Sequence, residues 1–152
     1  MLQLNLPNFE PKLKKIEGEV FVFDLIRRKY LLLSPEEWVR QNFLNYLINH
    51  KNYPRSLMEN EAIIKLNNMT RRCDTVVYNN LLEPLLIIEY KRPDVKIDQS
   101  VFDQIVRYNS VLKVDYLIVS NGLHHFCCKM NYDDQSYVFL QEIPEYGKLT
   151  DK

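Results

Sequence analysis

The sequence predicts an α/β fold in which helices flank a mixed central β-sheet. Residues 34–50 combine a helix start signal with apolar residues at helical spacing. Three segments rich in β-branched and aromatic residues follow between positions 60 and 91. A second helical pattern at residues 98–112 then precedes another apolar strand. This order of helix, three strands, helix and strand is typical of domains that pack helices onto a sheet.

The N-terminal part is expected to form an arm and a hairpin. Residues 1–15 show no regular pattern and are predicted to be irregular. Residues 17–33 are rich in Val, Ile, Phe and Tyr, which predicts two strands that turn near residues 27–29. We therefore expect one domain spanning residues 1–152, in which residues 1–33 precede a core at residues 34–143.

The first helix has a well-marked beginning. Ser34 can cap it, Pro35 suits its first position, and Glu37 completes a Ser-x-x-Glu capping box. We favour this capping role for Glu37 over a role in chemistry. The apolar stripe that predicts the buried face consists of Val39, Phe43, Tyr46 and Leu47.

The remaining elements follow in the order that a mixed sheet requires. The expected strands are residues 60–66, 71–78, 85–91, 115–122, 124–130 and 135–143, the last as an edge strand. The second helix, residues 98–112, interrupts them after the third strand. One face of this helix carries Val101, Gln104, Tyr108 and Val111.

The composition excludes several classes of function. The 20 Lys and Arg residues balance 20 Asp and Glu residues, so no overall field attracts nucleic acid or membrane. Three glycines are too few for a Walker-type or dinucleotide-binding loop. Three cysteines, two of them adjacent, indicate reduced thiols. With neither a signal peptide nor a membrane span in the sequence, we expect a cytoplasmic protein.

The third strand ends in charged residues, which are unfavourable in a buried strand unless they are paired or bind a metal. Alternation along the strand places Glu89 and Lys91 on the same face. If the preceding strand folds back with Tyr78 opposite Leu85, Asp74 faces Glu89 with Cβ atoms about 5 Å apart. Two facing carboxylates repel each other, and a hard divalent cation relieves the repulsion. The sequence therefore predicts a site for Mg²⁺, with Mn²⁺ as a substitute.

Other interpretations of the charged residues remain open. The alternative to a metal site is a salt bridge between Glu89 and Lys91, with Asp74 exposed. Arg71, Arg72 and Arg92 suit contacts to phosphate, or are simply solvated strand ends. A zinc site is disfavoured because consecutive strand residues face opposite sides and no second ligand pair follows at finger-like spacing. The residues that would form it are His124, His125, Cys127 and Cys128.

The pattern Asp74…Glu89-x-Lys91 after a first helix resembles the PD-(D/E)xK nuclease superfamily. The segment "QIVRY" supplies Gln104 and Tyr108 and resembles the Q-x-x-x-Y element of nuclease domains in type I restriction enzyme R subunits. The "RRCD", "IEYKRP" and "YLIVSNG" strands also resemble that N-terminal domain. The similarity covers roughly residues 34 to 130.

This resemblance implies a restriction-endonuclease-like core and a metal-dependent DNA endonuclease. Asp74 and Glu89 would be metal ligands and Lys91 the catalytic lysine. The other residues implied at the site are Glu37 as an additional acid, with Gln104, Tyr108, Arg72 and Arg92 contacting DNA or positioning the site.

The sequence departs from the family pattern in two respects. Cys73 stands before Asp74, where the superfamily name has proline. The sequence also lacks the ATP-driven translocase of a complete R subunit, so a motor or specificity subunit of a restriction system is expected as a partner that delivers the domain to DNA. The alternative function is a catalytically silent nucleic-acid-binding or assembly module with the same fold.

Overall fold

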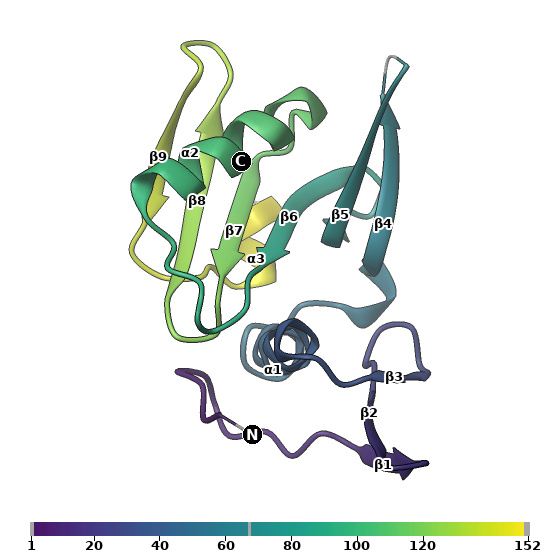
Figure 1. The fold of residues 1–152 in the computed structure, drawn as a ribbon. Coiled ribbons are helices and arrows are strands. Elements are labelled where there is room, and N and C mark those ends of the chain that lie inside the picture. Colours follow the sequence, from purple (N-terminus) through teal and green to yellow (C-terminus); the bar gives the residue numbers. More distant parts are fainter. Residues whose placement is uncertain (1, 67, 151–152) are drawn as a thin grey trace.

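A six-stranded mixed sheet forms the centre of the computed structural model, which describes residues 2–66 and 68–150, without the side chains of Leu66 and Val111. Its strands lie in the order β4-β5-β6-β7-β8-β9 (Figure 1). They are β4 (Met58–Leu66), β5 (Met69–Tyr78), β6 (Pro84–Tyr90), β7 (Tyr116–Ser120), β8 (His125–Asn131) and β9 (Ser136–Leu140). Strands β6 and β7 are parallel and all other neighbours are antiparallel. The predicted fold class is confirmed.

Helices cover both faces of this sheet. Helix α1 (Pro35–His50) packs on one face and α2 (Gln99–Asn109) on the other, where it crosses β7 to β9 in Figure 1. The core on the α1 side includes Phe43, Leu47, Leu86, Ile88, Tyr90 and Ile118. The core on the α2 side includes Ile87, Phe102, Val106, Leu117 and Val119. Alternate residues of β6 thus enter different cores, as the period of a strand dictates.

Helix α1 begins where its cap predicts. The hydroxyl of Ser34 accepts a hydrogen bond from the backbone N–H of Glu37 at 3.0 Å. The side chain of Glu37 does not complete the box; it accepts a bond from Gln41 instead. Val39, Phe43 and Leu47 of the predicted stripe are fully buried, and Tyr46 is partly buried.

The second helix turns a different face to the sheet from the one that carries Gln104 and Tyr108. Its buried residues, among those that the structure describes, are Phe102, Val106 and Asn109. Gln104 and Tyr108 are exposed and Val101 is half-buried, while the side chain of Val111 lies outside the described part of the chain. Both stripes have helical spacing, and the sheet covers the one that carries Phe102 and Val106.

The N-terminal segment forms a separate three-stranded antiparallel sheet. It consists of β1 (Leu13–Ile16), β2 (Glu19–Phe23) and β3 (Tyr30–Leu32). The hairpin of β2 and β3 is confirmed, but the prediction of an irregular arm up to residue 15 is wrong at its end. Every residue of β1 is exposed, so main-chain pairing with β2 holds this strand. Its sequence therefore lacks the alternation of apolar and polar residues from which a strand is predicted.

Three smaller differences occur along the main sheet. Tyr78 pairs with Pro84 and not with Leu85, because a bulge lies between Val77 and Tyr78. A short helix, α3 (Tyr146–Thr150), follows β9 where none was predicted. Two 3-10 turns, η1 (Arg55–Leu57) and η2 (Ser110–Leu112), join the larger elements. None of the helices among the described residues has the length and apolar character needed to cross a membrane.

Candidate active site

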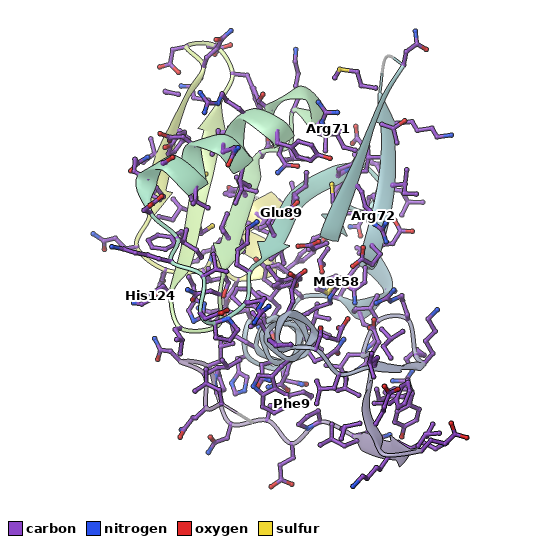
Figure 2. All side chains as sticks on the ribbon, viewed as in Figure 1. Phe9, Met58, Arg71, Arg72, Glu89 and His124 are labelled. Carbon is purple, nitrogen blue, oxygen red and sulfur yellow. The ribbon has the colours of Figure 1, made fainter. Side chains whose placement is uncertain are left out.

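The register of β5 and β6 brings two carboxylates together. The ladder between the two strands ends at the pair of Thr75 and Ile88, and the same register continued by one residue puts Asp74 opposite Glu89. The bulge at Tyr78 lies at the other end of the pairing and does not shift this register. Glu89 lies near the centre of the molecule (Figure 2). Besides burial, the charge of Asp74 raises the pKa of Glu89, which agrees with the predicted facing of the two acids.

Two hydrogen bonds hold Asp74, one at its side-chain carboxylate and one at its backbone carbonyl. Its Oδ2 accepts a hydrogen bond from the backbone N–H of Tyr90 at 2.8 Å. Its carbonyl oxygen accepts one from Nη1 of Arg40 at 3.1 Å. Asp74 is only partly buried.

The surroundings of Glu89 disfavour its charged form. Burial, then the charge of Asp74, raises the pKa of Glu89 to about 9, and Lys91 partly offsets this. Its Oε1 is buried and has no hydrogen-bond partner among the described residues. Without a cation, Glu89 would therefore hold a proton at neutral pH. A bound cation would replace that proton and satisfy the unpartnered oxygen.

Lys91 follows the last residue of β6 and continues its pairing. Its backbone N–H donates to the carbonyl of Ser120 on β7 at 2.8 Å. The Lys91 charge lowers the pKa of both Glu89 and Glu36. No ion pair between Lys91 and Glu89 occurs within 4 Å in the described part of the chain. The simple salt bridge that competed with a metal site is therefore not formed.

The first helix turns Glu36 toward the carboxylates. Burial is the largest cause that raises the pKa of Glu36, and the charge of Asp74 comes next. Glu37 instead lies in a buried network, with Oε2 at 3.3 Å from Nε of Arg40. Adjacent residues on a helix point about 100° apart, and the capping pattern alone does not say which one faces the site. The acid from this helix that approaches Asp74 is Glu36, which sequence reasoning missed.

A second missed residue comes from α2. Asn109 is buried, and it lowers the pKa of the neighbouring Glu89 carboxyl group, against the larger effects of burial and of the Asp74 charge. Its Nδ2 donates to the carbonyl of Ile105, and its Oδ1 is buried without a partner among the described residues. Asn109 directly follows Tyr108 in the "QIVRY" segment, which is the one signal that could have drawn attention to it.

Gln104 and Tyr108 themselves lie on the outer face of α2. Tyr108 is 46% exposed, and its ring lies 4.6 Å from the guanidinium of Arg71. Nε of Arg71 also donates to the Tyr108 carbonyl at 3.0 Å. The structure thus joins Tyr108 to the basic residues of β5 and not to the carboxylates.

The other basic residues are exposed and have acidic neighbours. Arg72 pairs with Glu61 at 2.9 Å, and its side chain is 71% exposed. Arg92 pairs with Asp94 at 3.2 Å, with a side chain 56% exposed. Exposed pairs of this kind contribute little stability. Both arginines could therefore exchange their carboxylate partners for phosphates.

The donor set of the site suits a hard cation. The described residues contain no group of three or more His, Cys, Asp and Glu side chains that could hold a metal. The site thus offers two carboxylates, which is a set that Mg²⁺ accepts when water and substrate phosphate complete its shell. The ring nitrogens of His125 are bonded to Ser120 and Asn5, and burial raises the pKa of Cys127 and Cys128 to about 12. These contacts further disfavour zinc.

Comparisons with known proteins concern the fold and the family of this chain. One solved structure, a fragment described as an HsdR subunit of a type I restriction enzyme from Vibrio vulnificus YJ016, matches with a TM-score of 0.52 and 16% identity over 77% of this chain. The chain spans 25% of the length of that fragment. A DrdV–DNA complex matches with a TM-score of 0.45 and 12% identity, over 76% of this chain and 11% of that one. A search of curated proteins found no match.

The family comparison covers the elements that build the site. Residues 35–144 match the family described as the type I restriction enzyme R protein N terminus (HSDR_N). The match extends from the start of α1 to beyond β9, and so includes Asp74, Glu89 and Lys91. Because it covers more than half of the chain, this protein belongs to the HSDR_N family of type I restriction enzyme R protein N-terminal domains.

Proposed function

We propose that this domain is a Mg²⁺-dependent deoxyribonuclease of the PD-(D/E)xK type, acting as the nuclease part of a restriction system. The observation that carries the proposal is the pair of facing carboxylates, Asp74 and Glu89, with one buried oxygen of Glu89 unpartnered. Membership of the R-protein N-terminal family supports the restriction context. The similarity in fold to the HsdR fragment supports the architecture.

The roles of the residues follow from where they lie. Asp74 and Glu89 would hold the cation, which when bound would polarise the scissile phosphate and acidify a water molecule. Lys91, at the end of β6, would orient the attacking water or hold the phosphate. Glu36, whose pKa is raised by burial and by the charge of Asp74, would bind a water molecule of the ion's shell. Arg72 and Arg92 would contact the DNA backbone on either side.

Thermal unfolding in MnCl₂ or MgCl₂ tests the cation site. A cation at ten times its Kd stabilises the native state by about 1.4 kcal/mol, which raises the melting temperature measurably. Asp74→Asn should abolish that increase. Asp133→Asn is the matched control, because it removes the same charge from an exposed turn and should retain the full response. An equal response in wild type and Asp74→Asn would show that the cation binds elsewhere.

Cleavage of supercoiled plasmid then separates catalysis from silent binding. We expect Mn²⁺-dependent nicking by the wild type and by Asp133→Asn, and none by Asp74→Asn. If the wild type binds the cation and DNA without cleaving, the chain is the silent module of the alternative function. Supplying the motor subunit of a restriction system in the same assay tests whether cleavage requires a partner.

A further inference from the structure

The ladder between β4 and β5 is interrupted opposite the first metal-ligand candidate. Asn60 pairs with Thr75 and Ala62 pairs with Cys73, but the pair between them, Glu61 and Asp74, is absent from the ladder. Glu61 has a φ of 53°, a left-handed conformation that residues other than glycine rarely adopt. A residue persists in such a conformation when its surroundings hold it there. The carbonyl of Asp74 thus needs another partner.

Arg40 supplies that partner from α1. Its Nη1 donates to the Asp74 carbonyl at 3.1 Å, and its Nη2 donates to Glu61 at 2.6 Å. The side chain is 4% exposed, and Glu37 lies against its Nε at 3.3 Å. Burial would lower the pKa of Arg40, but the charges of Glu37 and Glu61 raise it overall, so the guanidinium remains charged. The rigid fork of donors spans the gap in the ladder.

The same guanidinium packs on the second group that holds Asp74. It lies 5.6 Å from the centre of the Tyr90 ring, and the backbone N–H of Tyr90 donates to Oδ2 of Asp74. Tyr90 is buried, and its hydroxyl lies 3.0 Å from the Thr75 hydroxyl. Arg40 therefore contacts Asp74 directly through its carbonyl and indirectly through Tyr90.

We propose that Arg40 is a positioning residue that sets the orientation of the Asp74 carboxylate, in place of the missing ladder pair with Glu61. The effect of Arg40 on the orientation of Asp74 is inferred from the contacts described above alone. The consequence for cation binding and cleavage rests on the proposed function. Arg40 touches neither substrate nor cation in this scheme, and acts through Asp74.

Hydrogen exchange of the Tyr90 amide, measured by NMR on the full chain, reads this positioning directly. Arg40→Lys keeps a positive charge but loses the fork that joins Asp74 to Glu61. Loss of this hydrogen bond should lower the local stability around Tyr90. The exchange rate of the Tyr90 amide should then rise about tenfold relative to the rates of the Leu86–Ile88 amides in the same strand. An unchanged ratio in the folded variant overturns the proposal.

Arg27→Met is the matched control for general destabilisation. Arg27 belongs to the same charged network, since it pairs with Asp24 at 2.7 Å and lies 3.8 Å from Glu37, but it has no contact with Asp74. The Arg27→Met substitution should lower the melting temperature and leave the exchange rate of the Tyr90 amide, relative to the Leu86–Ile88 amides, unchanged. If Arg27→Met raised the relative exchange rate of Tyr90 as much as Arg40→Lys does, the charged network as a whole would hold Asp74. The proposal of a specific role for Arg40 would then be wrong.

A second variant keeps the test decisive if Arg40→Lys does not fold. Glu61→Asn tolerates the left-handed conformation and shortens the side chain that anchors Arg40. It should also speed Tyr90 exchange, and no change would overturn the proposal.

Titration with Mn²⁺ separates the two claims. If the proposed function holds, Arg40→Lys binds Mn²⁺ more weakly than Arg27→Met does. If the wild type binds no Mn²⁺, the proposed function fails, while the exchange ratio of Tyr90 still decides the role of Arg40.

Discussion

Lys91 shows how much a single residue depends on its place at the end of a strand. Its backbone is fixed by the bond to Ser120, so its side chain leaves the sheet beside Glu89. The charge of Lys91 lowers the pKa of both Glu89 and Glu36, although Lys91 forms no close ion pair with Glu89 among the described residues. An ammonium held near two acids without being neutralised by either is available to a water molecule or a phosphate.

Substitution of Lys91 tests that availability. Lys91→Ala should fold and bind Mn²⁺ yet lose plasmid cleavage by about 10²- to 10⁴-fold, the range typical of a positioned acid–base group. Lys91→Arg should restore little, because a guanidinium stays protonated and presents a planar fork. Lys96→Ala, an exposed lysine in the following loop, serves as the control. Full cleavage by Lys91→Arg would exclude proton transfer by this residue.

At the scale of an element, a buried carboxylate joins the N-terminal sheet to the main domain. Asp24 follows β2 and is fully buried. It accepts bonds from the N–H groups of Ile26 and Arg27 in the turn before β3, and from the amide of Asn60 on β4. Nε of Arg27 lies at 2.7 Å from the same carboxylate. One side chain thus closes the turn and fastens the small sheet to β4.

The stability that Asp24 contributes should depend on pH. Burial raises its pKa most, but the bonds from Arg27, Asn60 and Ile26 together lower it below the ordinary 3.8. A carboxyl group with a lowered folded pKa stabilises the protein above its unfolded pKa and loses this contribution as the pH falls through the folded value. Asp24→Asn should therefore destabilise by about 2 kcal/mol at pH 7.

Urea denaturation at several pH values measures this difference. The gap between wild type and Asp24→Asn should shrink as the pH falls below 3.8, the ordinary value for an aspartate. Asp133→Asn, in an exposed turn, should follow the wild type throughout. A gap that stays constant with pH would mean that the hydrogen-bond acceptors of Asp24 matter and its charge does not.

At the scale of the whole molecule, charge balance limits how the domain can meet DNA. The 20 basic and 20 acidic residues leave no net field, and Arg72 and Arg92 each have an acidic neighbour. Arg71 and Arg72 precede Asp74 on β5, toward the turn that joins this strand to β4. Contacts to phosphate are therefore few and local.

Binding of duplex DNA by the isolated chain should be weak and salt-dependent. About four phosphate contacts, from Arg71, Arg72, Lys91 and Arg92, would give a log–log salt slope near −3.6 and a Kd of about 10⁻⁴ to 10⁻⁶ M. Titration of labelled duplex at two salt concentrations measures both quantities. Nanomolar binding that ignores salt would show that the chain recognises DNA unaided and needs no partner to deliver it.

Local rules were sufficient for most of the elements and for the central pair of acids. Ser34 begins α1 because a cap depends on its own turn, and the period of two places Glu89 and Lys91 on one face of β6. The facing of Asp74 and Glu89 could be predicted because a hairpin register follows from short-range pairing. The bulge at Tyr78 was not predicted, but it lies on the side of the hairpin away from the site.

Only the tertiary structure decided which other side chains reach that pair. The capping pattern singles out Glu37, but the packing of α1 on the sheet turns Glu36 toward Asp74 and Glu37 toward Arg40. The face of α2 that the sheet covers turns Asn109 inward and leaves Tyr108 outside. Arg40 meets the Asp74 carbonyl only because α1 packs against the hairpin of β4 and β5, which follows it in the sequence. Sequence patterns record the periodicity of one element, whereas these contacts depend on how separate elements pack, which no local pattern encodes.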